Sequence, residues 1–243
     1  MIAFRELDDA DPALVHSPML RGIDKIFAWM GEHGGIPLTP SKAFKRIFVH
    51  WAAAEFDWPG HTEADLFAVN KVLNEPDFAP LMLLHDLMTA MKLGRHYKGE
   101  FRLTKAGQAL IGHPGRIFAT TVPFFLFRIN HASMSPFEDE PILGNWDVFL
   151  NVLNVQTDDG ANGGHLRREL FGEPEAGPIR RYDDVMAQLY IQVLRPLCWS
   201  GLLQQAQGKR SYHMEEAIFM KTPLWRAAVR LDTDKILRKV TWH

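Results

Sequence analysis

One order of local features, which occurs twice along the chain, limits the fold more than any other property of this sequence. A stretch with helical apolar spacing is followed by a glycine, by two short strand-like runs, and by a threonine that can cap a further helix. The first copy covers residues 80–111 and the second covers residues 180–225. We therefore predict a mainly α chain with small β-hairpins, of the α+β class.

In the first copy, an apolar helical face over residues 80–93 ends at Gly94. Residues 95–97 and 101–103 are predicted strands, because a Lys-Gly pair between them is typical of a hairpin turn. Thr104 follows and can accept hydrogen bonds from the first turn of a helix. This order is that of the winged variant of the helix-turn-helix fold, in which the hairpin is the wing.

The second copy repeats this order with little sequence identity. Its helix is followed by a predicted hairpin turn over residues 207–209 and a return strand over residues 211–214, and Thr222 precedes a last helix. Aligning Gly94 with Gly201 superposes the two hairpins to within about two residues. We interpret the two copies as a shared architecture.

The two copies divide the chain into three predicted parts. Residues 19–127 form a first winged-helix-like module, residues 128–178 an acidic helical connector, and residues 179–243 a second winged-helix-like module. Over residues 129–178, nine carboxylates stand against two arginines, and prolines and glycines interrupt the chain. We expect the modules to pack through this connector, and a lid or an oligomer contact are the alternatives for it.

The composition limits the compartment and the partners. A single cysteine, Cys198, excludes an intramolecular disulfide and fits a reducing compartment. The most apolar run, residues 117–129, is shorter than the stretch of about 20 residues that spans a membrane. We predict a cytoplasmic protein without membrane contact. The formal net charge of −2 provides no global field for nucleic acid, so such binding would depend on a local patch.

Three stretches of the first half resemble a module of uncharacterised bacterial proteins, among them those similar to the plasmid Orf-3 group. They are residues 34–39 (GGIPLT), residues 84–94, and residues 101–107 (FRLTKAG). The resemblance covers about 90 residues and implies a winged-helix-like module. Because that group has no settled activity, the resemblance implies no catalytic residue.

Eight lysines and arginines of the first module form the predicted nucleic-acid contact. Wings contact phosphates, where lysine and arginine neutralise backbone charge and release counterions. The helix before the wing offers His85, Asp86, Thr89 and Lys92, a set that argues against sequence-specific reading of bases. The predicted contact residues are Lys42, Lys45, Arg46, Lys92, Arg95, Lys98, Arg102 and Lys105.

No pattern in the sequence predicts catalysis, a metal or a cofactor. The eleven histidines include no HxxxH or HExxH spacing, and one cysteine is too few for a cysteine-based zinc site. We therefore expect a non-enzymatic binding protein that takes no cofactor. An enzyme would require several of Glu138, Asp139, His131 and His165 to converge in one pocket.

Two classes of partner stay open. Nucleic acid, in double-stranded form, is favoured by the analogy of fold. The alternative is a protein-interaction or scaffold role as a homo-oligomer, for example a dimer. Aromatic residues such as Phe124, Phe125 and Trp146 supply more apolar surface than one small module needs, and such surface serves cores and interfaces alike.

Overall fold

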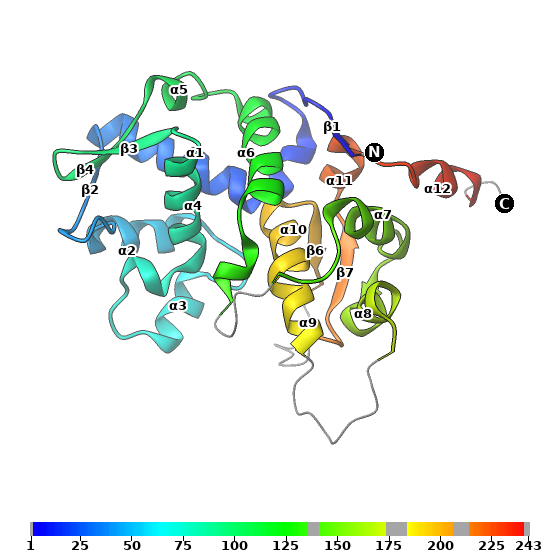
Figure 1. Cartoon of the computed structure of the whole chain (residues 1–243). Helices are drawn as coiled ribbons and strands as arrows, with labels where there is room; N and C mark the ends of the chain where they lie inside the picture. Colours follow the sequence, from blue (N-terminus) through cyan, green and yellow to red (C-terminus); the bar gives the residue numbers. More distant parts are fainter. Residues whose placement is uncertain (1, 136–140, 174–183, 207–213, 241–243) are drawn as a thin grey trace. The chain divides into compact units, whose positions relative to one another are not determined.

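The computed structural model describes residues 2–135, 141–173, 184–206 and 214–240. The chain forms two compact units (Figure 1). The N-terminal unit is Asp8–Thr121, and the C-terminal unit combines Met1–Leu7 with Val122–His243. As predicted, the described chain is mainly helical and carries small antiparallel sheets. None of the helices in its described residues is long and apolar enough to cross a membrane.

The N-terminal unit contains a set of helices and one three-stranded sheet. Its elements in chain order are η1 (Pro12–His16), α1 (Pro18–His33), β2 (Ile36–Pro37), α2 (Arg46–Glu55), α3 (Glu63–Val69), η2 (Glu75–Asp77), α4 (Ala79–Ala90), β3 (Gly94–Tyr97), β4 (Glu100–Leu103) and α5 (Lys105–Gln108). The next helix, α6 (Pro114–Arg128), begins in this unit and ends in the other.

Local chemistry explains where α1 begins and ends. The side chain of Ser17 accepts a hydrogen bond from the Leu20 backbone N–H, and Pro18 occupies the first turn, where a missing N–H costs nothing. Gly34 ends the helix with a φ of 77°, a conformation that glycine adopts without strain. Along the helix, Ile23 and Ile26 are fully buried and anchor it to the core of the unit.

The sheet of the N-terminal unit has the order β2-β4-β3, and all of its strand pairs are antiparallel. Phe101 of β4 pairs with Ile36 on one side and with His96 on the other. Both Phe101 and Ile36 are fully buried, so one face of the sheet closes the core. Figure 1 shows β2, β3 and β4 together, with α4 beside them.

The C-terminal unit includes the first strand of the chain. Its elements are β1 (Ala3–Phe4), η3 (His131–Met134), α7 (Trp146–Gln156), β5 (Ala161–Asn162), α8 (Gly163–Phe171), α9 (Asp184–Leu189), the π-helix η4 (Tyr190–Leu194), α10 (Arg195–Ser200), β6 (Leu203–Gln205), β7 (Ile218–Lys221), α11 (Pro223–Ala228), β8 (Val229–Arg230) and α12 (Asp234–Val240). β1 pairs with β8, and a second sheet has the order β5-β7-β6.

The two units share the order of their elements and of their sheets. In each, a helix leads to a short strand, further helices follow, and a hairpin then adds its second strand to the middle of the sheet. Phe219 of β7 pairs with Ala161 of β5 and with Gln205 of β6. Like Phe101, Phe219 is fully buried. The central strand of each sheet therefore supplies a phenylalanine to the core of its unit.

This arrangement differs from the predicted division at residues 128–178. The predicted connector contains α7, β5 and α8, which belong to the same compact unit as β6 and β7 because β5 pairs with β7. Parts of the predicted connector, residues 136–140 and 174–178, lie outside the described residues. The first unit extends over Asp8–Thr121 rather than residues 19–127.

The second hairpin is shifted from its predicted position. Its return strand is β7 (Ile218–Lys221), directly before Thr222, whereas residues 211–214 were expected to form it. Residues 207–213 lie outside the described chain, and Met214 belongs to a turn. The capping threonine sets the true position, because its backbone must stand next to the end of the preceding helix.

The hydrogen bonds of the two threonines correct the alignment of the copies. The Thr104 N–H donates to the Leu93 carbonyl at 2.9 Å, and the Thr222 N–H donates to the Leu202 carbonyl at 3.1 Å. Gly201 therefore corresponds to Lys92, two positions before Gly94. Both residues have positive φ angles, 82° for Gly201 and 56° for Lys92, since each reverses the chain between helix and hairpin.

Candidate nucleic-acid interface

The β3–β4 hairpin has one buried face and one exposed face. Cross-strand partners of an antiparallel pair lie on the same face, and residues alternate between faces along each strand. Phe101 and its partner His96 therefore share the face toward the core. Arg95 pairs with Arg102 on the opposite face, which also carries Tyr97 and Glu100. Positive charge is thus concentrated on the outward side of the hairpin.

Three cations surround one aromatic ring on this outward side. The Tyr97 ring centroid lies 5.2 Å from Arg95 Cζ, 5.3 Å from Lys98 Nζ and 5.8 Å from Arg102 Cζ. These separations are within the range of cation–π attraction. We call Arg95, Tyr97, Lys98 and Arg102 the arginine–tyrosine surface.

One carboxylate accompanies these cations. Glu100 Oε2 accepts from Arg102 Nε at 2.7 Å, and Arg102 Nη2 lies 2.6 Å from the same oxygen. The pair is about half exposed, so water and salt weaken it. The direct opposition of Arg95 and Arg102 across the strands is unfavourable for the hairpin by itself. A bound anion would relieve this repulsion.

A hollow of about 390 Å³ lies beside the arginine–tyrosine surface. The end of α1, the outward face of the hairpin and the segment around α5 line it. Its lining residues are Met30, Gly31, Gly34, Arg95, Tyr97, Arg102, Leu103, Gln108 and Ile111. All of them belong to the N-terminal unit, so this unit alone builds the hollow.

The structure places the eight predicted contact residues at the surface and brings three of them together. Arg95, Lys98 and Arg102 meet at Tyr97. The other five lie on different segments of the same unit: Lys42 in the loop before α2, Lys45 and Arg46 at the start of α2, Lys92 between α4 and β3, and Lys105 at the start of α5. Arg46 donates to Asn74 Oδ1 at 2.9 Å.

The helix before the hairpin is largely covered. In α4, His85 is buried together with most of the apolar residues, whereas Asp86 and Thr89 are exposed. Of the four polar residues that the sequence offers on this helix, His85 is therefore unavailable for contact because it is buried in the core. A helix that reads bases needs a row of exposed donors and acceptors, so the geometry favours the hairpin over α4 as the contact element.

A chain of hydrogen bonds that no sequence pattern predicted begins in the core. Glu75 is 3% exposed and His85 is 7% exposed. Glu75 Oε1 lies 2.7 Å from His85 Nδ1, and Glu75 Oε2 accepts from the Phe44 N–H at 2.6 Å. His85 Nε2 lies 2.8 Å from His96 Nε2. The chain thus ties η2, α4, β3 and the loop before α2 together.

No spacing in the sequence could have revealed this chain, because its members lie on separate elements. His96 is the exposed end of this chain of hydrogen bonds, although it lies on the same face of the hairpin as the buried Phe101. Partial burial, followed by electrostatic interaction with His85 and Lys42, lowers the pKa of His96, which favours its neutral imidazole. A neutral ring at His96 can share a hydrogen bond with His85, whereas two doubly protonated rings would repel each other.

The candidate enzyme residues do not form one described site. His131 is buried against the ring of Phe125, with centroids 4.8 Å apart. His165 borders a separate hollow of about 440 Å³ and lies 2.8 Å from Gln156 Oε1. Glu138 and Asp139 lie outside the described residues. Within the described chain, no group of three or more histidine, cysteine or acidic residues is arranged to hold a metal ion.

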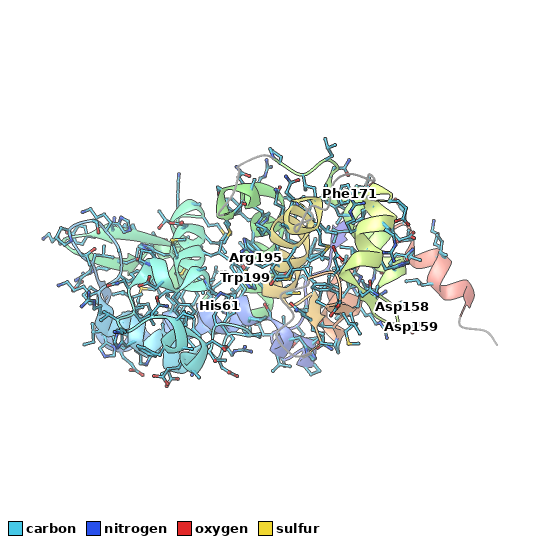
Figure 2. All side chains as sticks on the ribbon, turned by 90° about the horizontal axis from the view of Figure 1, so that it is seen from below. His61, Asp158, Asp159, Phe171, Arg195 and Trp199 are labelled. Carbon is cyan, nitrogen blue, oxygen red and sulfur yellow. The ribbon has the colours of Figure 1, made fainter. Side chains whose placement is uncertain are left out.

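Two further charged groups have local partners. Asp158, at the turn shown with Asp159 in Figure 2, lies 2.8 Å from Lys221 Nζ and 3.2 Å from Arg226 Nη2. Arg195 lies over the ring of Trp199, with Cζ 5.0 Å from its centroid (Figure 2). The Asp158 contacts join separate segments of the C-terminal unit, whereas Arg195 and Trp199 are one helical turn apart in α10.

Comparisons with known proteins divide the chain in two, as the structure does. Residues 15–116 match the family model of the Y4jL N-terminal domain, and residues 135–223 match that of the y4jL C-terminal domain. The chain is 32% identical over 209 residues to a Sinorhizobium fredii (strain NBRC 101917 / NGR234) protein described as "Uncharacterized protein y4jL". The matched region is 84% of this chain and 94% of that relative.

No solved structure matches the chain significantly. The matches confirm the predicted membership of a bacterial family without an assigned activity. They lend no support to the resemblance to the Orf-3 group. Both halves and nearly the whole length of the relative are covered, so the chain belongs to the Y4jL family.

Proposed function

We propose that the protein binds nucleic acid and that the arginine–tyrosine surface contacts the phosphate backbone. One observation carries the proposal: Arg95 and Arg102 face each other on the exposed side of the hairpin, with Lys98 and both arginines within 6 Å of Tyr97. Like charges in this position cost stability. Phosphates would neutralise them and release counterions.

The order of elements supports a winged-helix-like interpretation of both units. A helix, a strand, further helices and a hairpin, with the last strand in the middle of the sheet, is the order expected of such a module. On this interpretation, β3 and β4 form the wing of the N-terminal unit. Because α4 exposes few polar side chains, we expect binding that tolerates many sequences and depends on phosphate contacts.

Fluorescence anisotropy with labelled oligonucleotides tests the proposal. Affinity should fall steeply between about 50 and about 200 mM salt. The triple substitution of Arg95, Lys98 and Arg102 by alanine should weaken binding for every sequence and flatten the salt dependence by about one unit per lost phosphate contact. Unchanged binding by this variant, or no binding by the natural protein at low salt, would contradict the proposal.

A matched control removes three positive charges from other positions on the protein surface. Lys71, Arg116 and Arg128 are exposed and lie outside the arginine–tyrosine surface. Their triple substitution by alanine lowers the net charge by the same amount as the test variant. If binding depends on the hairpin, the control should keep the affinity and the salt dependence of the natural protein. Equal losses in both variants would indicate a general charge effect.

A homo-oligomeric scaffold is the second candidate function, and exposed apolar side chains of α2 and α3 favour it. Ile47 is 67% exposed and Val69 is 81% exposed. Phe67 is also exposed, and its ring centroid lies 5.5 Å from that of His50 on α2. Sedimentation at increasing protein concentration should then show a rising mass, and Ile47→Asp should keep the protein monomeric. A constant monomer mass would exclude this role.

A further inference from the structure

We propose that the hollow beside the arginine–tyrosine surface holds one unpaired nucleotide, so that the protein binds single-stranded nucleic acid more tightly than duplex. This inference rests on the proposed function and specifies its ligand. A surface that contacts phosphates alone would serve both forms. The hollow adds features that only an exposed base can use.

The walls of the hollow suit a flat, apolar ring. Tyr97 is 41% exposed and Ile111 is 47% exposed, and both border the hollow with Met30. Stacking of bases on aromatic side chains is the common basis of binding to single strands, and every base offers the face that it needs. In a duplex, both faces of each base are already stacked on neighbouring bases.

The backbone at the end of α1 leaves room for a ligand. A Cβ atom added at Gly31 or Gly34 would meet no other atom within 4 Å. Both glycines also line the hollow. The volume of about 390 Å³ falls within the usual range for small-ligand sites, about 300–1,000 Å³.

Polar groups at the rim match the remaining parts of a nucleotide. Arg95 and Arg102 line the hollow, and a guanidinium group can hold a phosphate with two parallel hydrogen bonds. Gln108, exposed at the end of α5, carries an amide that both donates and accepts. This amide can pair with the edge of a base, which is free only in an unpaired strand.

The test compares one sequence in single-stranded and duplex form, as both DNA and RNA, by anisotropy at fixed salt. Single strands should bind about tenfold more tightly, the order of the contribution of one stacked base. Tyr97→Ala should weaken single-strand binding more than duplex binding and so remove most of this difference. Tyr97→Phe keeps the ring and should behave like the natural protein. Ile111→Asp places a carboxylate in the hollow and should weaken single-strand binding selectively.

The outcomes separate this inference from the proposed function. Equal affinity for both forms, or single-strand binding that Tyr97→Ala and Ile111→Asp leave unchanged, overturns the nucleotide site. The proposed function would survive if the triple substitution of Arg95, Lys98 and Arg102 still reduced binding. Absence of binding to either form overturns both. Thermal unfolding of each variant verifies that it is folded, and the exposed positions make this the expected result.

Discussion

Glu75 is a buried acidic residue whose carboxylate makes two hydrogen bonds in the core. Its carboxylate accepts from the Phe44 N–H at 2.6 Å and lies 2.7 Å from His85 Nδ1. A buried carboxylate is expensive unless partners satisfy its oxygens. Here a backbone amide and an imidazole do so, and the rings of Phe44 and His85 stack with centroids 3.9 Å apart.

Glu75→Gln should destabilise the N-terminal unit by about 1–3 kcal/mol. The amide of glutamine has one acceptor oxygen, so its NH₂ group would face either the Phe44 N–H or the His85 ring. Urea unfolding measures the loss. Glu55→Gln is the control, because Glu55 pairs with Lys25 at the exposed surface, where such a pair contributes at most about 1 kcal/mol. Similar losses of stability in both variants would contradict the prediction that the buried hydrogen bonds of Glu75 stabilise the unit.

His131 makes the C-terminal unit sensitive to acid. Burial holds the pKa of its imidazole at about 4, below the ordinary 6.5. The unfolded chain therefore binds a proton at a higher pH than the folded chain, and stability decreases as the pH falls from about 6.5 toward about 4. The full effect of such a shift is about 3 kcal/mol.

His131→Phe should reduce this loss, because phenylalanine does not titrate and can pack near the rings of Phe125 and Trp146. The measurement is the free energy of unfolding of both proteins at neutral pH and near pH 4.5. The natural protein should lose more stability between the two conditions than the variant does. An equal loss would show that other groups cause the acid sensitivity.

At the scale of elements, an equivalent threonine in each unit connects the helix after the hairpin to the end of the helix before it. Thr104 Oγ1 donates to the Lys92 carbonyl at 2.6 Å and accepts from the Gly107 N–H at 3.2 Å. Thr222 Oγ1 donates to the Gly201 carbonyl at 2.6 Å and accepts from the Trp225 N–H at 3.4 Å. One hydroxyl thus connects the start of one helix to the end of another.

Thr104→Ala and Thr222→Ala should each destabilise the unit that contains the residue by about 1 kcal/mol or somewhat more. The loss includes the cap and the hydrogen bond to the preceding helix. Thr104→Ser and Thr222→Ser keep the hydroxyl and should recover most of the stability. Calorimetry of the four variants checks this, and alanine variants as stable as the serine variants would contradict it.

At the scale of the whole molecule, the first residues of the chain complete the unit formed by its second half. Ala3 pairs with Arg230 and Phe4 with Val229, and the Arg5 N–H donates to the Ala228 carbonyl at 2.7 Å. Residues before Asp8 therefore belong to the C-terminal unit, the next segment forms the N-terminal unit, and the chain re-enters the C-terminal unit at Val122. Pairing of segments so distant in sequence carries a large loop-closure entropy cost.

Deletion of residues 2–7 should lower the unfolding temperature of the C-terminal unit by on the order of 5 °C. The deletion removes the β1–β8 pairing and the contact of Phe4 with Phe127, whose ring centroids lie 5.9 Å apart. Nucleic-acid affinity should be unchanged if the N-terminal unit carries it. A deleted protein that unfolds at the natural temperature would show that β1 adds no stability.

Features with a short range in sequence were predicted well. The hairpin predicted at residues 95–97 and 101–103 is β3 and β4 with one further residue each. The caps at Thr104 and Thr222 form as expected. Three of the eight predicted contact residues, Arg95, Lys98 and Arg102, lie around Tyr97 because they belong to this hairpin. Alternation along the two strands places Arg95 and Arg102, the turn places Lys98, and local capping hydrogen bonds place the two threonines.

Contacts between distant segments were decided only by the tertiary structure. β5 joins β7 across more than fifty residues, so the acidic stretch that looked like a connector contributes one short strand to a sheet. Glu75, His85 and His96 meet because η2, α4 and β3 pack together. The sequence by itself determined the local elements, since neighbours in the chain set turns, caps and apolar faces. Burial and strand partners depend on how those elements pack, and no local pattern encodes that choice.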